Sequence, residues 1–457
     1  MTAPCDWSPS SWTTRPGADA VAYPDRGELD RAVHTLGALP PLVTSWEIEA
    51  LRGQIAQAQG GQRFLLQGGD CAEALDDCTS DSIASKLKIL LQMSLVLVHG
   101  TGRPVTRVGR FAGQYAKPRS SPTETREVNG RRLTLPSYFG DLFNAAPFDE
   151  ASRRPDPARM VRAYQHAALT LNFIRALIDG GFADLHHPEY WDLSFFRHAS
   201  LSPERRRQYE EMTRSVADGL RFMEALGERQ LSQQRTDFFC SHEGLSLHYE
   251  SAQARTVPRR EGYYLLTTHL PWIGDRTRDP SGAHVEFFRG IRNPVAVKLG
   301  PSATGEQALR LCEILNPANE PGKIVLIPRL GARNAERALP ALVEPVVRSA
   351  RRVLWVSDPM HANTTTTPGG IKTRLFDDVR AELEASIDAH RRLGTHLGGV
   401  HVELTGQDVT ECLGGASGIT EADLATRYDS LCDPRLNYQQ ALELAFVLAG
   451  RLRPTAG

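Results

Sequence analysis

The feature that most constrains this 457-residue chain is a series of short apolar segments, most of them followed by a polar, glycine-containing stretch and a helical pattern. This alternation indicates parallel β-strands joined by helical crossovers. Eight such strands close into a (β/α)8 (TIM) barrel, and we therefore predict an α/β fold of that type. The expected strands are residues 63–68, 104–109, 236–241, 263–268, 293–299, 323–328, 352–357 and 398–404.

Two parts of the chain depart from this pattern. Residues 1–60 are predicted to form an N-terminal extension, with helices over Glu28–Gly37 and Trp46–Gln59. The stretch between the second and third strands is too long for one crossover. Its helical patterns at 157–179 and 203–227 predict an inserted helical pair, within about 150–232 of a catalytic barrel spanning 61–457. A doubly wound open sheet is the alternative, but no GxGxxG motif opens a helix after any expected strand.

Composition excludes several classes of protein. The formal net charge is −1, which argues against a binder of nucleic acid or anionic membrane that relies on bulk electrostatics. The longest apolar stretch, Ile89–Val98, is interrupted and too short to span a bilayer. The seven cysteines are scattered without a CxxC pair, which argues against a disulfide framework. We expect a cytoplasmic protein without a membrane or nucleic-acid partner.

Polar side chains follow the ends of the expected strands, where (β/α)8 enzymes carry their active sites. One group is cationic, and lysine and arginine suit phosphate or carboxylate ligands. For any one of these cationic side chains, a surface salt bridge is a better explanation than ligand binding. Their joint placement at the strand ends nevertheless predicts one or two strongly anionic substrates. This group is Arg110, Lys117, Arg119, Arg276, Arg278, Lys298 and Arg329.

A second group has the side chains of metal ligands: Cys71, His361, Glu403 and Asp433. Mixed sulfur, nitrogen and oxygen donors suit a borderline divalent ion better than magnesium or calcium. Their spacing gives no local motif. Taken alone, Cys71 is also explained as a buried small apolar residue, and His361 as a hydrogen-bonded loop residue.

The segments at the strand ends closely resemble, in order, those of the type II (plant-type) 3-deoxy-D-arabino-heptulosonate 7-phosphate (DAHP) synthases. The similarity covers almost the whole chain, and this family has a (β/α)8 fold with N-terminal and inserted helices. The segments that carry the resemblance are LLQGGDCAE (65–73), AGQYAKPRS (112–120), SHEGL (241–245), WIGDRTR (272–278), GAHVEFFRGIRNPVAVKLGPS (282–302), DPMHANT (358–364), GIKTR (370–374), GGVHVELTG (398–406), TECLGG (410–415) and CDPRLN (432–437).

The resemblance implies the condensation of phosphoenolpyruvate with erythrose 4-phosphate, the first step of the shikimate pathway. It implies Lys298, Glu243 and Arg276 as catalytic residues, and Cys71, His361, Glu403 and Asp433 as metal ligands. The residues expected to hold phosphoenolpyruvate are Arg110, Glu243, Asp275, Arg276, Lys298 and Arg329. Those expected to hold the sugar phosphate are Lys117, Pro118, Arg119 and Ser120.

The resemblance also implies a cofactor and partners. We expect one divalent metal ion per subunit, Mn²⁺ or Co²⁺ first, with Fe²⁺, Zn²⁺ and Cd²⁺ as alternatives. Family members generally self-associate and some bind a chorismate mutase. We therefore expect a homodimer or homotetramer, with a chorismate mutase as a candidate partner.

Three departures from the family pattern leave alternatives open. Asp275 stands where the family usually has glutamate, Thr364–Thr367 replace a histidine and an acid of many relatives, and the loop at 76–78 is altered. These departures favour a copy that serves a specialised-metabolite pathway. The alternative functions are a related phosphoenolpyruvate-aldose synthase or aldolase that uses another aldehyde, and a non-catalytic regulatory relative. The intact set of metal-ligand residues argues against the last.

Overall fold

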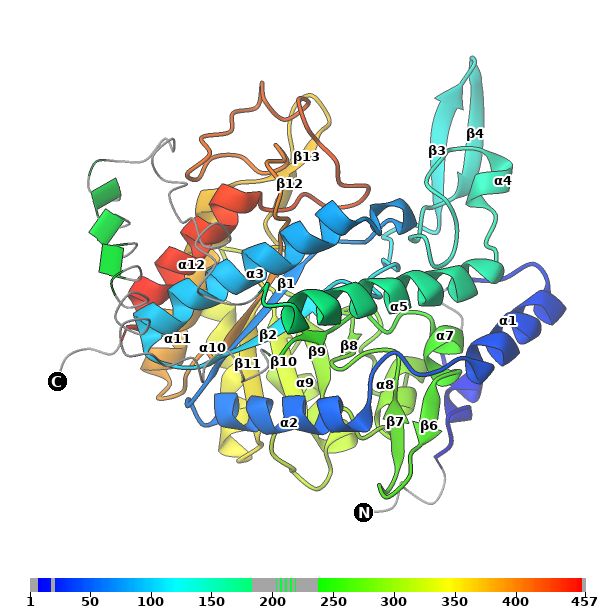
Figure 1. Cartoon of the computed structure of the whole chain (residues 1–457), viewed down its shortest axis with the longest axis horizontal. Coiled ribbons are helices and arrows are strands. Elements are labelled where there is room, and N and C mark those ends of the chain that lie inside the picture. The colour runs from blue at the N-terminus through cyan, green and yellow to red at the C-terminus, as the bar shows by residue number, and fades with distance from the viewer. Residues whose placement is uncertain are drawn as a thin grey trace.

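A sheet of eight parallel strands forms the centre of the fold (Figure 1). The computed structural model describes residues 7–17, 21–182 and 237–453, with eight further positions between 203 and 218. The strands follow the order β5-β2-β1-β14-β11-β10-β9-β8. They are β1 (Phe64–Gly69), β2 (Val105–Arg110), β5 (Phe239–Cys240), β8 (Trp272–Ile273), β9 (Val295–Leu299), β10 (Ile324–Pro328), β11 (Val353–Ser357) and β14 (Gly399–Glu403).

The two edges of this sheet meet, which closes it into a barrel. The backbone N–H of Trp272 donates to the carbonyl of His242 across 3.0 Å, and the N–H of Gly244 donates to the carbonyl of Trp272 across 3.0 Å. These bonds join β8 to the residues directly after β5. The predicted α/β fold of the (β/α)8 type is thereby confirmed.

One of the expected strands is wrong. Within 263–268, β7 (Tyr263–Leu265) pairs antiparallel with β6 (Ala254–Thr256) instead of entering the barrel. The barrel strand is β8, which is only two residues long and follows Pro271. A two-residue strand leaves no periodic apolar run, so the longer run at 263–268 was the stronger signal.

A helix follows each barrel strand, as the alternating pattern predicts. Side-chain caps begin several of them, including capping boxes at Thr304 and Asn437, which satisfy backbone N–H groups of the first turn. The helices are α3 (Ser80–Thr101), α5 (Ala158–Asp179), α7 (Leu247–Ser251), α8 (Ala283–Phe288), α9 (Gly305–Leu315), α10 (Ala335–Arg348), α11 (Phe376–Arg392) and α12 (Tyr438–Leu452).

Helix α3 is an internal helix of this layer. By length and composition it is the one helix among the described residues that could cross a membrane. Its most apolar window is 67% buried, and the helix packs against α12 and α5 (Figure 1). Such burial is typical of a core helix, so α3 is weak evidence for a membrane span.

Helix α2 (Ser45–Gln59) closes the amino end of the barrel (Figure 1). Its Leu51, Ile55 and Ala58 are fully buried in one cluster with inward side chains of the strands, including Leu65 and Val108. Burying a leucine or isoleucine side chain contributes roughly 1.5–3 kcal/mol. Polar chemistry is therefore confined to the opposite end, where the strands finish.

The remaining elements are peripheral. Helices occur where the sequence predicts them in the N-terminal part and over 157–179, whereas the expected helix over 203–227 lies for the most part outside the described residues. Two hairpins were not predicted, and β3–β4 projects from the body (Figure 1). These elements are η1 (Ser11–Thr14), α1 (Arg26–Ala38), η2 (Leu75–Asp77), β3 (Thr123–Val128), β4 (Arg131–Pro136), α4 (Glu150–Arg153), β12 (Thr364–Thr366) and β13 (Lys372–Arg374).

Candidate active site at the carboxyl ends of the strands

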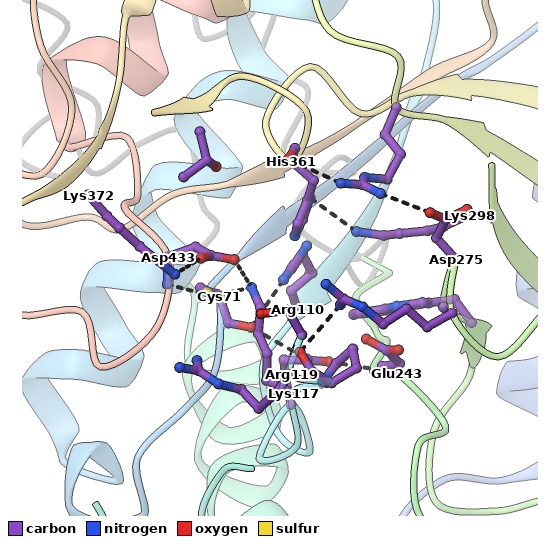
Figure 2. A pocket seen from close by; sticks show the side chains of 18 residues that line it. Cys71, Arg110, Lys117, Arg119, Glu243, Asp275, Lys298, His361, Lys372 and Asp433 are labelled. Carbon is purple, nitrogen blue, oxygen red and sulfur yellow. Dashed lines mark hydrogen bonds and ion pairs between the residues drawn. The ribbon is translucent and has the colours of Figure 1, made fainter. Parts of the chain in front are cut away.

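A cavity of about 250 Å³ lies at the carboxyl ends of the barrel strands (Figure 2). Every residue expected in the site lines it except two, Glu403, which is fully buried beside it, and Arg278, which is buried. The labelled Cys71 and Asp433 lie on one side of the cavity, and Lys298 and Asp275 on the other (Figure 2). The lining also includes Gln114, Trp272, Gly274, Thr364 and Lys372, which sequence reasoning did not assign.

Close backbone packing places the first two strand ends. Gly69 ends β1 with φ +145°, and a Cβ there would lie 2.9 Å from the carbonyl oxygen of Arg110. After β2 the chain turns through Ala112–Gln114, whose three N–H groups all donate to the buried carboxylate of Glu73 at 2.8–3.0 Å. Glu73 therefore fixes the turn that leads to Lys117.

The four expected metal ligands converge. One donor atom each of Cys71, Glu403 and Asp433 lies within 4.8 Å of the others. Nε2 of His361 lies 2.8 Å from Oε1 of Glu403, while its Nδ1 lies 2.7 Å from Oδ2 of Asp358. A carboxylate on the far ring nitrogen is the usual way to orient a metal-binding histidine. Among the described residues, one thiol and two carboxylates thus lie close enough to share a divalent ion, and the imidazole of His361 beside Glu403 is the fourth candidate donor.

The ammonium of Lys117 lies among these donors. Its Nζ is 2.6 Å from Sγ of Cys71, 2.6 Å from Oδ2 of Asp433 and 3.2 Å from Oε1 of Glu403. Burial raises the pKa of the Cys71 thiol, and the neighbouring carboxylates raise it further. Burial also opposes ionisation of Glu403, but His361 and Lys117 together hold its pKa well below the usual range. This point of the site therefore attracts positive charge.

Lys298 is buried on the other side of the cavity. Its Nζ donates to Oδ2 of Asp358 at 2.8 Å and lies 5.6 Å from the centre of the Trp272 ring. Burial, aided by the charge of Arg110, lowers the pKa of Lys298 to about 8, although Asp358 opposes the shift. This lysine can therefore lose its proton near neutral pH.

Arg110 connects the cationic group to the donor cluster. Its Nη2 lies 3.0 Å from Oε1 of Glu403, and its Nη1 bonds to Nε2 of His401, a fully buried residue on β14.

Burial raises the pKa of nearby Glu243, although Lys298 opposes the shift. Glu243 therefore retains its proton to a higher pH than an ordinary glutamate.

Asp275 lines the cavity and contacts two arginines directly. Its Oδ1 accepts from Nε of Arg278 at 2.8 Å and from the N–H of Gly300 at 2.7 Å, while its Oδ2 lies 3.0 Å from Nη1 of Arg329. Burial opposes ionisation of Asp275, but these donors lower its pKa. In this chain the shorter aspartate arm therefore orients Arg278 and Arg329.

Three of the four predicted sugar-phosphate residues, Pro118, Arg119 and Ser120, lie toward the rim, and Ser120 is exposed. Arg276, which was expected to hold phosphoenolpyruvate, is also exposed, and its Nη1 lies 3.5 Å from the carbonyl oxygen of Pro118. Nη2 of Arg119 lies 3.5 Å from a carboxylate oxygen of Glu124 on the projecting hairpin. These side chains surround the mouth of the cavity, whereas Lys117 lies at its base.

Arg374 is a site residue that sequence reasoning missed. It is fully buried, its Nη2 lies 2.8 Å from Oε2 of Glu403, and its Nε donates to Oγ1 of Thr364 at 3.0 Å. Its Nη1 also bonds to the carbonyl of Pro434, next to Asp433. The sequence did contain a signal, because the GIKTR segment at 370–374 is one of those that carry the family resemblance, but no role was predicted for its arginine.

Comparisons with known proteins show the family of this chain. A family model described as the class-II DAHP synthetase family matches residues 7–449. A phospho-2-dehydro-3-deoxyheptonate aldolase of Neurospora crassa is 47% identical over 98% of this chain and 94% of its own length. A protein of the same name from Streptomyces coelicolor is 47% identical over 99% of this chain and 100% of its own length. The chain therefore belongs to the class-II DAHP synthetase family.

Proposed function

We propose that this enzyme condenses phosphoenolpyruvate with erythrose 4-phosphate to give DAHP and inorganic phosphate. The observation that carries the proposal is the convergence of the Cys71/His361/Glu403/Asp433 donor set and a ring of cations on one cavity. Two phosphorylated substrates repel each other, so a cationic cavity is required to hold them in attack geometry. The printed names of the two relatives support the same reaction.

The donor set fits a divalent ion, which we propose as the cofactor, with Mn²⁺ or Co²⁺ as first candidates. When bound, such an ion would polarise the aldehyde oxygen and stabilise the negative charge that develops there. It would also supply the positive charge that Lys117 supplies in the donor cluster. The ammonium of Lys117 then becomes available for a substrate phosphate.

The cavity's own side chains have the remaining roles. Lys298, Arg110 and Arg329 hold the phosphate and carboxylate of phosphoenolpyruvate, with Trp272 as one wall. The methylene carbon of phosphoenolpyruvate bonds to the aldehyde carbon of erythrose 4-phosphate, whose oxygen takes up a proton. Water then adds to the adjacent carbon of phosphoenolpyruvate and loses a proton. The bond from this carbon to the phosphate oxygen breaks, which releases inorganic phosphate and leaves the ketone. Glu243 retains a proton because it is buried, so it is our candidate for proton transfer during this sequence.

Phosphate release tests the proposal. Purified enzyme with both substrates should release phosphate and yield a product with the mass of DAHP, and a chelator should abolish turnover until Mn²⁺ or Co²⁺ is restored. Release with another phosphorylated aldose, but not with erythrose 4-phosphate, would identify a related synthase instead. Metal-replete protein that never turns over but alters a second enzyme would identify a regulatory relative.

Several finer features are part of the proposal. We propose a cytoplasmic homodimer or homotetramer, with a chorismate mutase as a candidate partner, which sedimentation of the protein alone and with that enzyme would test. The division into an extension (1–60) and a barrel (61–457) is also proposed. Asp275 and Thr364, the first residue of the altered stretch Thr364–Thr367, line the cavity and differ from the family pattern, which supports a copy serving a specialised pathway.

A further inference from the structure

The loop that carries Asp433 has no regular secondary structure to fix it. Residues 429–435 lie between β14 and α12 and belong to neither strand nor helix. A metal-ligand side chain on such a loop depends on contacts with the rest of the protein for its position. Asp433 must nevertheless lie close to Cys71, which is 362 residues away along the chain.

One buried carboxylate, Glu411, holds this loop. Its Oε1 accepts from the backbone N–H groups of Asp429 and Ser430 at 3.2 and 2.9 Å. Its Oε2 accepts from the N–H of Arg435 at 2.6 Å, and the guanidinium of Arg435 binds both oxygens at 3.1 and 2.7 Å. Glu411 is fully buried, so these bonds are shielded from water. Both ends of the loop are thus tied to one side chain.

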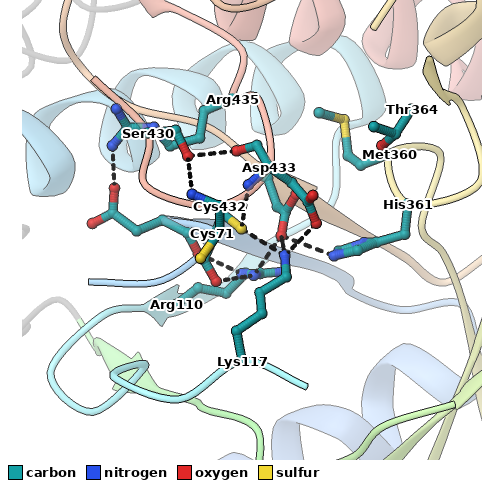
Figure 3. Close-up of polar contacts among 12 residues, drawn as sticks. Cys71, Arg110, Lys117, Met360, His361, Thr364, Ser430, Cys432, Asp433 and Arg435 are labelled. Carbon is teal, nitrogen blue, oxygen red and sulfur yellow. Dashed lines mark hydrogen bonds and ion pairs between the residues drawn. The ribbon is translucent and has the colours of Figure 1, made fainter. Parts of the chain in front are cut away.

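Arg435 continues the connection to the other metal-ligand loop. Its Nη1 lies 2.8 Å from Oδ1 of Asp70, the residue directly before Cys71. The second oxygen of Asp70 lies 2.5 Å from Nζ of Lys86 on α3, which neutralises this buried carboxylate. Cys71, Asp433 and Arg435 lie together in the structure (Figure 3). The backbone N–H of Asp433 donates to Sγ of Cys71 across 3.2 Å, so the two loops touch at the thiol.

We propose that Glu411, Arg435 and Asp70 form a positioning triad that sets the separation of the Cys71 thiol and the Asp433 carboxylate, and thereby the affinity of the site for a divalent ion. This inference rests on the proposed metal-dependent function. The triad residues touch neither the substrates nor the ion in this scheme. They act through the two ligands, because bidentate ion pairs fix both distance and orientation.

A charge effect must be separated from a positioning effect. If Coulomb interactions alone matter, removing the positive charge of Arg435 increases the affinity for a nearby cation. If Arg435 positions Cys71 and Asp433, removing it decreases that affinity. The variant Arg435→Gln therefore gives opposite results under the two explanations. We expect its Kd for Co²⁺, measured by equilibrium dialysis of the full-length protein, to rise at least tenfold.

Spectroscopy reports which ligand is displaced. Co²⁺ bound by a thiolate gives a charge-transfer absorption band, and we expect this band to weaken in Arg435→Gln even at saturating Co²⁺. The double variant Asp70→Asn/Arg435→Gln should bind Co²⁺ no more weakly than the worse single variant, because both changes break the same ion pair. Independent, additive losses would overturn the triad.

Glu443→Gln is the matched control. Glu443 is also a fully buried carboxylate that accepts a backbone N–H, that of Ala416 at 2.6 Å, but it is not among the triad or the cavity lining. We expect Glu443→Gln to lower Tm without changing the Kd for Co²⁺. An equal loss of affinity in this control would show general destabilisation and overturn the proposal.

The remaining outcomes are equally decisive. Unchanged or tighter Co²⁺ binding by folded Arg435→Gln overturns the positioning role while leaving the proposed function intact. Failure of the wild-type protein to bind Co²⁺ overturns the proposed metal site and this inference with it. If Arg435→Gln does not fold, Arg435→Lys replaces it, because lysine keeps the charge but loses the fork, and we again expect at least a tenfold rise in Kd.

Discussion

The Nζ atom of Lys117 lies 2.6 Å from the sulfur of Cys71. This contact joins the two chemical groups that the sequence suggests separately, the cations and the metal-ligand residues. Asp433 and Glu403 also contact the same ammonium. A divalent ion bound by these donors would replace contacts that Lys117 now makes, and an anion bound by Lys117 would do the same, so the two binding events would be coupled.

The first prediction concerns Cys71. Cys71→Ala should abolish metal-supported activity and raise the Kd for Co²⁺ at least a hundredfold, because it removes the sulfur donor. Thermal unfolding should change little, since Cys71 packs only in a small cluster with Tyr138 and Cys432, apart from the large apolar clusters of the barrel. Cys312→Ala is the control, because Cys312 is equally buried but packs in the apolar cluster around α9. Full activity of Cys71→Ala in the presence of a chelator would refute the assignment.

The second prediction concerns pH and Lys298. The pKa of Lys298 is lowered to about 8, so the amine is positively charged below this pH and neutral above it. An anionic substrate requires the charged form. The KM for phosphoenolpyruvate should therefore rise about tenfold per pH unit above pH 8 and stay level below it. Steady-state kinetics between pH 6.5 and about pH 9.5 measure this.

A matched lysine controls for general effects of pH. Lys323 is also buried with a lowered pKa, about 7, but it donates to the carbonyls of Ile291 and Asn293 away from the cavity. Lys323→Met should keep the wild-type pH profile, whereas Lys298→Met should lose it together with most phosphoenolpyruvate binding. A pH profile that survives in Lys298→Met would assign the titration to another group.

The third prediction concerns Asp275. Asp275→Asn removes the charge that orients Arg278 and Arg329, so we expect KM for phosphoenolpyruvate to rise about tenfold, equivalent to about 1.4 kcal/mol. Asp279→Asn is a suitable control, since Asp279 lies in the same loop but is exposed, and its carboxylate accepts hydrogen bonds from Ser281. Equal effects of the two changes would argue against an orienting role.

The fourth prediction concerns two glycines. Gly113 has φ +146°, and a Cβ there would overlap the ring of His242, so Gly113→Ala should destabilise the protein by about 2 kcal/mol or more. Gly53 lies inside α2 with no atom near its missing Cβ. Gly53→Ala should therefore stabilise by about 0.5–1 kcal/mol. Denaturant unfolding of both variants measures the difference, and the same sign for both would contradict this explanation.

Sequence pattern predicted most of the barrel because seven of its strands are continuous apolar or mixed runs. It missed β8, because this two-residue strand follows Pro271 and the longer apolar run at 263–268 just before it gave the stronger strand signal. The expected site residues could be placed at one end because parallel strands share their direction. Lys117 at the base and Arg119 at the rim could not be distinguished, since the two residues are only two positions apart and their places depend on how the loop turns.

The supporting carboxylates could not be found from spacing. Glu73 and Glu411 act by accepting backbone N–H groups, which every residue except proline offers. Such contacts do not require a particular residue type at the partner position, so they produce no recognisable sequence motif. Arg374 was missed for a related reason, because its partners Glu403 and Pro434 become neighbours only after the barrel closes.

The two shortest strands of the barrel, β5 and β8, are neighbours, and the isolated bridge between Glu243 and Trp272 lies at their junction. Few amide–carbonyl pairs span that seam, so local opening costs less free energy there than elsewhere in the wall. Amide hydrogen exchange should consequently be faster at this junction than along β9 and β10. Glu243, the carboxyl group that we propose for proton transfer, lies at this junction, so we expect the barrel wall beside it to open more readily than the wall formed by β9 and β10.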